Sequence, residues 1–348
     1  MSARDDRIAR LRESLEEPLL VSNPCNVLYL VGFRSSNAYL LVEDDRVRLF
    51  TDFRYAEAAR AVPGVEAVET RRDVAADLAE LLSGRIGFES RDLTYARYET
   101  LAAGGLELVP RASLVEELRA VKDEGELEAI RAAARITSEA FERLPEERFV
   151  GRTERDLAWR VEELFHELGA DGPAFPPIVA GGANGARPHA EPGDRTIESG
   201  QLVVVDAACA LDGYCSDCTR TFATGEISDE LRRAYDVCLE GQLAGLDAVR
   251  AGIDGRSADA AAREVIANGG LGDHFRHGLG HGVGLEVHEA PGLAEPSTDT
   301  LAAGNVVTVE PGIYLEGRGG VRIEDLVIVG DDGAEVLTSF TKELVTVD

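Results

Sequence analysis

Two pairs of carboxylates stand at the ends of apolar segments, where they could hold cations. Asp206 ends the apolar run 202–206, and Asp217 follows shortly after it. Glu310 ends the run 306–310, and Glu324 lies inside the strand-like segment 320–329. Carboxylates that project together from apolar segments lose hydration and repel each other unless a positive charge lies between them. Each pair taken alone could also be ordinary surface acids.

A hairpin signal connects the members of the first pair. Asp212-Gly213 lies between two apolar runs, and this dipeptide favours a two-residue β-hairpin turn. With these residues in the turn, position 211 faces 214 and position 206 faces 219. Asp217 is then the diagonal neighbour of Asp206 on the same face of the hairpin. We therefore predict that one partner can reach both carboxylates.

The second pair follows the same logic. The glycine-rich segment 317–320 predicts a reversal between two apolar strands. Folding the chain about residues 317–318 places Glu310 nearly opposite Glu324. Two more acids are therefore expected to face inward.

Half of the six histidines fall within one short segment, at His277, His281 and His288. Glycines at 278, 280, 282 and 284 exclude a stable helix there, and with it a helical zinc motif. A dinucleotide fingerprint is also excluded, because its third glycine would fall at Val283. Glycines beside a histidine fit close backbone packing around a metal or a substrate. A histidine satisfied in the core is the alternative for any one of the three.

Four carboxylates and one imidazole form a donor set that indicates the class of metal. Carboxylate-rich sites favour hard or borderline ions such as Mn²⁺, Co²⁺ or Mg²⁺. Four carboxylates neutralise two divalent ions, which fits a pair about 3.5–4 Å apart that share a bridging water. By contrast, we interpret the CxxC spacing of Cys215 and Cys218 as coincidence, because in a strand the two thiols point to opposite faces.

Composition excludes several classes of function. The net charge of −28 repels phosphate backbones and anionic lipid surfaces, so we expect neither nucleic acid nor membrane as a partner. No apolar run approaches the roughly 18 residues of a membrane span. The odd number of cysteines and a start without an apolar leader favour a cytoplasmic location.

The elements that must position these residues fall into two predicted domains. Residues 1–120 alternate short strands with helices and predict an α/β domain. The strands are expected at 27–31, 38–42, 47–50 and 85–88, and the helices at 55–62 and 73–82. A helical stretch at 113–144, interrupted at 122–125, marks the boundary. Residues 121–348 predict an α+β domain, with helices at 154–169 and 228–250 and strands at 202–206, 214–222, 284–287, 306–310 and 320–329.

These motifs, in this order and spacing, resemble the M24 or "pita-bread" metallopeptidase family. The family contains Xaa-Pro aminopeptidases, Xaa-Pro dipeptidases (prolidases), methionine aminopeptidases and creatinase. Residues 22–33 and 51–55 resemble the creatinase-type N-terminal domain, which methionine aminopeptidases lack. The resemblance implies a creatinase-like α/β domain, a pita-bread catalytic domain, two divalent metal ions with Mn²⁺ or Co²⁺ expected, short proline-containing peptides as substrates, and a homodimer.

The resemblance also assigns roles to residues of the metal centre. Asp206 would chelate one metal, and Asp217 and Glu324 would bridge both. His281 would bind the other metal, with Glu310 completing its shell. Glu310 is expected to accept a proton from the attacking water and pass it to the leaving proline nitrogen.

Five further residues match positions that line the substrate site of the family. They are His189, His277, His288, Tyr314 and Arg322. Within this set, His277 and His288 are expected to stabilise the carbonyl oxygen as it becomes negative.

Gly292 separates the two branches of the proline-specific peptidases. Prolidases of this size commonly carry an arginine at the matching position, suited to the free carboxylate of a dipeptide. The glycine therefore favours an aminopeptidase P-like enzyme that accepts longer peptides, with a strict dipeptidase as the alternative. A metal-free creatinase-like hydrolase and a non-catalytic pita-bread binding protein are further alternatives, and the complete set of five metal-binding positions opposes both.

Overall fold

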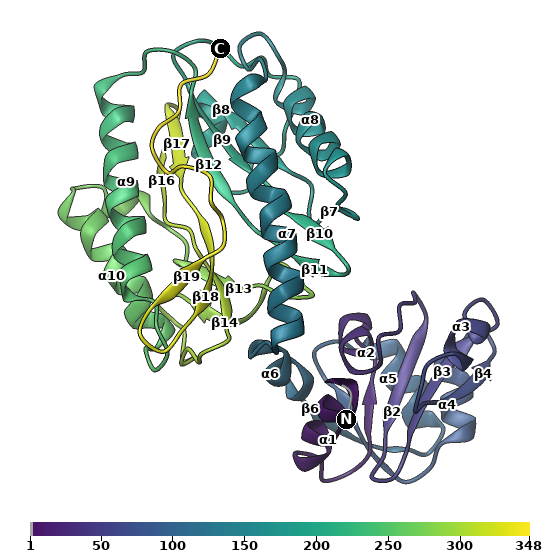
Figure 1. Ribbon diagram of the computed structural model, residues 1–348. Coiled ribbons are helices and arrows are strands. Elements are labelled where there is room, and N and C mark those ends of the chain that lie inside the picture. The colour runs from purple at the N-terminus through teal and green to yellow at the C-terminus, as the bar shows by residue number, and fades with distance from the viewer. Residues whose placement is uncertain (1–2) are drawn as a thin grey trace. The chain divides into compact units, whose positions relative to one another are not determined.

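The computed structural model describes residues 3–348, and the chain divides into two compact units between residues 119 and 120 (Figure 1). Unit 1 is Met1–Arg119 and unit 2 is Ala120–Asp348. Among the described residues, no helix combines the length and the apolar character needed to cross a membrane.

Unit 1 is built on a six-stranded sheet in the order β4-β3-β2-β1-β5-β6. Its strands are β1 (Leu19–Val21), β2 (Ala38–Val42), β3 (Val47–Asp52), β4 (Glu66–Thr70), β5 (Arg85–Glu89) and β6 (Glu107–Arg111). Its helices are α1 (Ala3–Glu13), α2 (Pro24–Val31), α3 (Ala56–Arg60), α4 (Val74–Leu81), α5 (Tyr95–Ala103) and α6 (Leu114–Ala120), which ends at the boundary. Strand β2 is antiparallel to both neighbours, and the other pairs are parallel.

One predicted strand of unit 1 is wrong. Residues 27–31 belong to helix α2. The side chain of Asn23 accepts hydrogen bonds from the first backbone N–H groups, Pro24 occupies the first turn, and Gly32 ends the helix in the left-handed conformation. These are ordinary start and stop signals of a helix. They outweigh the β-like appearance of the apolar run between them.

Unit 2 places its sheets between two pairs of helices (Figure 1). The helices are α7 (Glu124–Arg143), α8 (Glu154–Glu167), α9 (Asp229–Ala248) and α10 (Gly255–Asn268), with 3₁₀ turns at Leu144–Glu146, Gly182–Ala186 and Gly272–His274. The strands are β7 (Gly172–Pro173), β8 (Ile178–Gly181), β9 (Leu202–Asp206), β10 (Cys209–Leu211), β11 (Tyr214–Cys215), β12 (Thr219–Ala223), β13 (Gly280–Gly282), β14 (Glu289–Leu293), β15 (Val306–Val309), β16 (Gly312–Leu315), β17 (Gly319–Arg322), β18 (Asp325–Val329) and β19 (Ala334–Val336).

These strands form four sheets, and the two that matter for the site lie under different helix pairs. The three-stranded sheet β12-β9-β8 shares an apolar core with α7 and α8. The five-stranded sheet β14-β13-β15-β18-β19 packs its apolar residues against α9 and α10. Two smaller sheets, β11-β10-β7 and β16-β17, complete the set.

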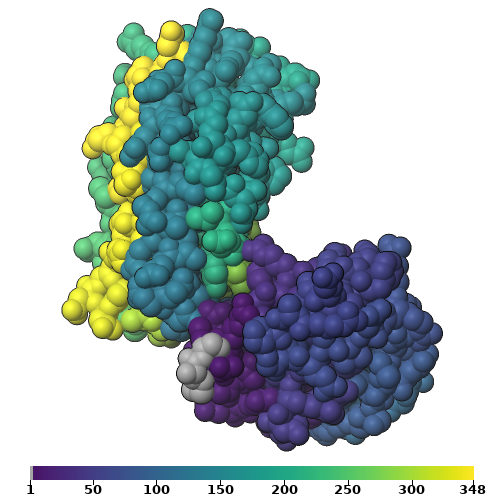
Figure 2. Space-filling model, turned by 45° about the vertical axis from the view of Figure 1, so that its right-hand side comes forward, coloured from purple at the N-terminus to yellow at the C-terminus, as the bar shows by residue number. Residues whose placement is uncertain are grey.

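Aromatic residues join the first core to the C-terminal segment. Phe222 on β12 is fully buried, and its ring centroid lies 5.3 Å from that of Phe149 and 6.0 Å from that of Phe340. Phe340 also lies 6.2 Å from Phe141 of α7. Figure 2 shows the C-terminal residues in yellow along the surface of the blue-teal helix α7.

Further predicted segments, at the boundary and in unit 2, need correction. Residues 284–287 are not a strand, because β13 ends at Gly282. The helical stretch 113–144 is interrupted at residues 121–123, where the side chain of Asp123 caps α7 together with Glu126. Gly125 therefore lies in the first turn of a new helix, where its low helix propensity matters little. Segments 214–222 and 320–329 are each divided into two strands, and the breaks contain Asp217 and Glu324.

Phe222→Ala tests the core beneath the site. Loss of a fully buried phenylalanine leaves a cavity between aromatic neighbours, so we expect unfolding to become easier by about 3–5 kcal/mol. Chemical denaturation followed by circular dichroism measures this change. Leu243→Ala, at a position that is 48% exposed on α9, is the matched control and should change stability by less than ~1 kcal/mol. Equal effects of the two substitutions would contradict this description of the core.

Candidate active site

The first carboxylate pair lies on a hairpin with the predicted register. Leu211 pairs with Tyr214, and Asp206 pairs with Thr219. Asp212 and Gly213 both have positive φ, 51° and 91°, which is the backbone that a type I′ turn requires. The register prediction is therefore confirmed. Asp217 lies in the break between β11 and β12, where its residue is only 3% exposed.

The second pair lies on a longer hairpin that is also in the predicted register. Leu315 pairs with Gly319 at its tip, and Val309 pairs with Asp325 at its base. Both pairs are symmetric about Gly317, whose φ of 76° makes the turn. Glu310 and Glu324, which directly flank the basal pair, therefore face each other across the hairpin.

The histidine segment enters between these hairpins as a strand that only glycine permits. A Cβ atom on Gly280 would lie 2.0 Å from the carbonyl oxygen of Thr308, and one on Gly282 would lie 2.2 Å from that of Ala290. Both distances are far below any van der Waals contact. The glycines therefore let β13 approach its two neighbours closely, and this approach carries His281 to the carboxylates.

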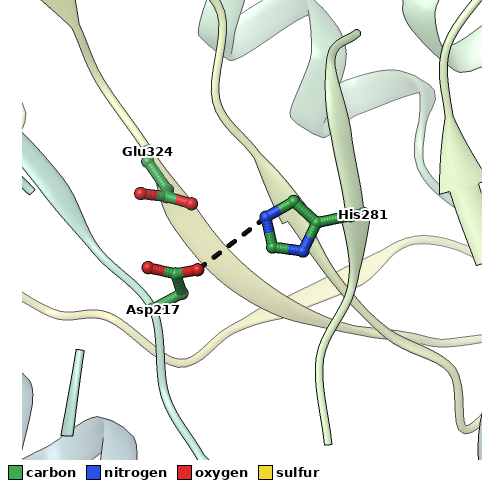
Figure 3. Close-up of side chains that lie close together, drawn as sticks. All are labelled: Asp217, His281 and Glu324. Carbon is green, nitrogen blue, oxygen red and sulfur yellow. Dashed lines mark ion pairs between the residues drawn. The ribbon is translucent and has the colours of Figure 1, made fainter. Parts of the chain in front are cut away.

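Asp217, His281 and Glu324 point toward one another from three different segments (Figure 3). One candidate ligand atom from each lies within 4.8 Å of the others. The Nε2 atom of His281 is 3.8 Å from Asp217 Oδ2 and 3.1 Å from Glu310 Oε1. Its Nδ1 atom lies 3.1 Å from the carbonyl oxygen of Gly282, which can only accept, so Nδ1 carries a proton. Nε2 is thus the nitrogen presented to the carboxylates, as in histidines that bind metals.

Burial and mutual repulsion make this cluster unfavourable without cations. Burial, followed by the charges of the neighbouring carboxylates, raises the pKa values of Asp217 and Glu324 well above their ordinary values. Burial also raises the pKa of Asp206, although Arg322 opposes the shift. Burial also acts to raise the pKa of Glu310, but the hydrogen bond from His281 and the charges of His281, His277 and Arg322 together lower it to about 2. The pKa of His281 rises to about 9, because its interactions with Glu310 outweigh the effect of burial.

The donor set fits divalent cations. The Oδ1 atom of Asp217 is buried and accepts no hydrogen bond from any residue of the described chain. A buried carboxylate oxygen without a partner is costly, and a bound cation would satisfy it. The five predicted ligands supply four carboxylates and one correctly oriented imidazole nitrogen. They match the oxygen-rich set that hard or borderline divalent ions prefer.

All of the predicted site residues line one cavity of about 430 Å³. This volume is within the usual range of small-ligand sites. The lining residues are Phe175, Ile178, Pro188, His189, Asp206, Asp217, His277, Gly278, Gly280, His281, His288, Ala294, Glu310, Tyr314, Arg322 and Glu324. The apolar wall formed by Phe175, Ile178 and Ala294 could not be predicted from the sequence, because nothing in an isolated apolar residue distinguishes a cavity wall from a core.

A chain of hydrogen bonds connects the substrate-side residues to the metal centre. The Nε2 atom of His277 lies 2.9 Å from the hydroxyl of Tyr314, and Nη1 of Arg322 donates to the same hydroxyl at 3.0 Å. Arg322 also donates to Asp206 Oδ2 and to the carbonyl oxygen of Pro188. The side chain of Arg322 is thereby held on three sides.

The three other histidines that line the cavity have different hydrogen-bonding states. Burial lowers the pKa of His277, so its ring is neutral: Nδ1 donates to the carbonyl oxygen of Gly278 at 2.8 Å, and Nε2 accepts from Tyr314. His288 and His189 are exposed, and neither ring nitrogen is hydrogen-bonded within residues 3–348. The ring of His288 lies 4.3 Å from that of His281, centroid to centroid.

Gly292 does not line the cavity. It lies on β14, and its N–H donates to Asp299 Oδ2 at 2.8 Å. A Cβ at this position would approach only that carboxylate, at 3.8 Å. Gly292 therefore contributes neither a side chain nor a positive charge to the cavity.

Comparisons with known proteins agree with this geometry. Residues 128–331 match metallopeptidase family M24, and residues 7–121 match the creatinase/prolidase N-terminal domain. An Xaa-Pro dipeptidase of Pyrococcus furiosus is 34% identical over 97% of this chain and 99% of its own. The structure of an Xaa-Pro dipeptidase from Bacillus anthracis has a TM-score of 0.94 at 38% identity and covers 99% of both chains. An X-Pro aminopeptidase from Thermotoga maritima has a TM-score of 0.87 at 33% identity, over 95% of this chain and 97% of its own.

The pKa shifts predict how the stability of the metal-free protein depends on pH. Asp217 and Glu324 have raised pKa values, so they stabilise the folded state below their ordinary values of 3.8 and 4.5 and lose this contribution as pH rises. His281 also has a raised pKa: it stabilises the folded state fully below its ordinary pKa of 6.5, and this contribution is lost as pH rises through about 9. Between about pH 5 and pH 9 the free energy of unfolding should therefore fall, by ~1 kcal/mol or more.

Urea denaturation of metal-free protein across this pH range measures the effect. Asp217→Asn removes one repelled carboxylate, so its stability should depend less on pH. Saturating Mn²⁺ should reverse the slope, because cations displace the protons. A metal-free protein whose stability rises steadily with pH would contradict this account of the cluster.

Proposed function

Because the chain belongs to metallopeptidase family M24, we propose that it is a two-metal Xaa-Pro dipeptidase, which hydrolyses the bond before the proline of a dipeptide. The observation that carries the peptidase reaction is the buried cluster of four carboxylates and His281 in the wall of the cavity. The preference for dipeptides is supported by relatives named Xaa-Pro dipeptidase at 34% and 38% identity. The expectation of an aminopeptidase P-like preference relied on Gly292, which lies outside the cavity lining.

Five residues would hold the metal ions: Asp206, Asp217, His281, Glu310 and Glu324. Two divalent ions at this place would lower the pKa of a water molecule and polarise the peptide carbonyl. We propose Mn²⁺ or Co²⁺, because carboxylates dominate the donor set. A homodimer and a cytoplasmic location remain predictions from the sequence.

Glu310 is the proposed proton carrier. Its low pKa keeps it ionised at neutral pH, as a general base must be. Its Oε1 atom accepts a hydrogen bond from the hydroxyl of Thr308 at 3.1 Å, which fixes the carboxylate at the cavity wall. An Xaa-Pro bond is a tertiary amide, so the leaving proline nitrogen has no proton and must receive one. Glu310 would take a proton from water and deliver it there.

His288 is the proposed donor to the carbonyl oxygen. Both of its nitrogens are without hydrogen bonds to the described chain, and its neutral ring lines the cavity. His277, by contrast, uses both nitrogens for Gly278 and Tyr314. The sequence assigned oxyanion stabilisation to both histidines; the hydrogen bonds favour His288 for this role and orientation of Tyr314 for His277.

The remaining cavity walls suit the two ends of an Xaa-Pro dipeptide. Phe175 and Ile178 offer an apolar surface for the pyrrolidine ring. Neither ring nitrogen of His189 is hydrogen-bonded within residues 3–348, and Arg322 donates to the carbonyl oxygen of the neighbouring Pro188. We propose that His189 and the charge of Arg322 together attract the free carboxylate of the dipeptide.

Glu310→Gln separates metal binding from proton transfer. The amide keeps the shape of the side chain and one ligand oxygen but cannot carry a proton. We expect much of the metal to remain bound while kcat falls by about 10²–10⁴-fold. Elemental analysis and initial rates measured on the same preparation give the two values. A variant with normal metal content and normal kcat would overturn the role of Glu310.

Substrate length distinguishes the proposed dipeptidase from an aminopeptidase. Metal-free protein refilled with Mn²⁺ or Co²⁺ should hydrolyse Xaa-Pro dipeptides with a kcat/KM at least tenfold above that for the matching Xaa-Pro-Yaa tripeptides. The free carboxylate should account for this preference, so His189→Ala should raise KM for dipeptides more than for tripeptides. Tripeptides cleaved as fast as dipeptides would identify an Xaa-Pro aminopeptidase instead. Cleavage of neither would support the binding-protein alternative.

A further inference from the structure

The chain contains 36 lysines and arginines, of which only Lys122 and Lys342 are lysines. Each lysine Nζ atom forms an ion pair of 2.8 Å with a carboxylate whose side chain is at least 95% buried: Lys122 with Glu289, and Lys342 with Asp325. Each of these carboxylates directly follows a site residue, because Glu289 follows His288 and Asp325 follows Glu324. We propose that the two lysines are positioning residues, one for the catalytic histidine and one for the metal-bridging glutamate.

Lys342 completes a buried network directly behind Glu324. Asp325 is fully buried and accepts four hydrogen bonds of 2.8 Å. Arg220 and Thr338 donate to its Oδ1 atom, and Gln242 and Lys342 donate to its Oδ2 atom. Every acceptor site of the carboxylate is therefore used, which leaves Asp325 a single orientation.

This network reaches Glu324 itself. Arg220 donates to the main-chain oxygen of Glu324 as well as to Asp325. The adjacent Thr219 accepts the N–H of Glu324 through its carbonyl oxygen at 3.1 Å and donates its hydroxyl to Glu324 Oε2 at 2.7 Å. Both the backbone and the carboxylate of the bridging ligand are thus held from behind. Without Lys342, Asp325 would lose one of its two cationic partners, and its Oδ2 atom would keep only the hydrogen bond from Gln242.

Lys122 acts on the segment that carries His288. Its side chain is 1% exposed, and that of Glu289 is 5% exposed. The carboxylate of Glu289 also packs against the backbone of Gly284, where a Cβ atom would lie 2.3 Å from Glu289 Oε1. Residues 284 and 289 bracket the loop that carries His288. The ion pair therefore fixes the end of a loop whose exposed histidine makes no hydrogen bond of its own to the described residues.

A compact ammonium suits both places better than a guanidinium. A lysine Nζ atom is a point charge on a flexible stem, whereas arginine needs room for a planar group with five donors. Asp325 already binds one guanidinium, from Arg220, and its second oxygen shares its remaining space with Gln242. All other lysine or arginine positions of the chain carry arginine, so the two lysines are exceptions to a strong preference.

The proposal rests on the proposed roles of Glu324 and His288, and it predicts different losses for the two lysines. Removal of Lys342 should weaken the binding of Mn²⁺ to metal-free protein by about 10–100-fold, the usual cost of losing an outer partner of a ligand. Removal of Lys122 should leave Mn²⁺ affinity within about twofold but lower kcat at saturating Mn²⁺ by about tenfold or more.

Lys342→Met and Lys122→Met are the test variants, and each is a control for the other. Glu289→Gln should reproduce the effect of Lys122→Met while keeping the lysine in place. Arg54→Met is the matched structural control, because Arg54 pairs with the fully buried Asp52 of unit 1 at 2.7 Å. It should change neither Mn²⁺ affinity nor kcat, even where it lowers the stability of the protein. Lys342→Arg should restore part of the metal affinity.

Calorimetric titration with Mn²⁺ needs no substrate, so it tests Lys342 even if no Xaa-Pro peptide is cleaved. For Lys122 the substrate-free measurement is the ¹³C–¹H spectrum of labelled histidine rings, in which the six histidines give six Cε1–H signals. Lys122→Met should move the signal assigned to His288 and leave that of His281 in place. Equal Mn²⁺ affinity in Lys342→Met and wild type, or an unmoved His288 signal with unchanged kcat in Lys122→Met, would overturn the corresponding assignment.

Discussion

Repulsion between buried carboxylates is the constraint on which the structure of the catalytic unit depends. Asp217 and Glu324 are at most 3% exposed and lie beside a third acid and His281, yet one oxygen of Asp217 accepts no hydrogen bond within residues 3–348. Such a cluster is stable only if protons or cations neutralise it. The folded chain therefore holds the acids together at a cost in free energy, and divalent ions offset this cost when they bind. This is the physical basis of a metallopeptidase with the pita-bread fold, to which the chain belongs.

Rigidity comes from two hairpins and one glycine strand. Each hairpin delivers two carboxylates, and its register is set by a turn at Asp212-Gly213 or at Gly317. Strand β13 brings His281 between them, because Gly280 and Gly282 allow backbones to approach more closely than any side chain would permit. Behind the ligands, buried ion pairs and threonine hydroxyls determine the directions of the carboxylates. Substrate groups are then presented to a centre that does not need to reorganise during the reaction.

The features that could be predicted from the sequence are those that depend on local interactions. The hairpin turns, the glycine strand and the inward carboxylates all depend on residues close together in the chain, and the register followed from counting outward from each turn. Errors arose where an apolar run was weighed above its caps, as at residues 27–31, or where a contact depends on the tertiary fold. The apolar wall of the cavity and the pairing of both nitrogens of His277 are contacts of this second kind. The expectation about peptide length that came from Gly292 depends on where residue 292 lies relative to the cavity, which the tertiary fold determines.

Calorimetric titration of metal-free protein with Mn²⁺ at neutral pH, in buffers of different ionisation enthalpy, tests the central claim most directly. The account predicts two ions per chain and a release of protons on binding, because cations displace the proton that His281 holds with its pKa of about 9. The raised pKa values of Asp217 and Glu324 act in the same direction. Substitution of Asp217 by Asn should reduce both the stoichiometry and the number of protons released. Binding without proton release, or an unchanged titration in that variant, would contradict the claim that repelled carboxylates form the metal centre.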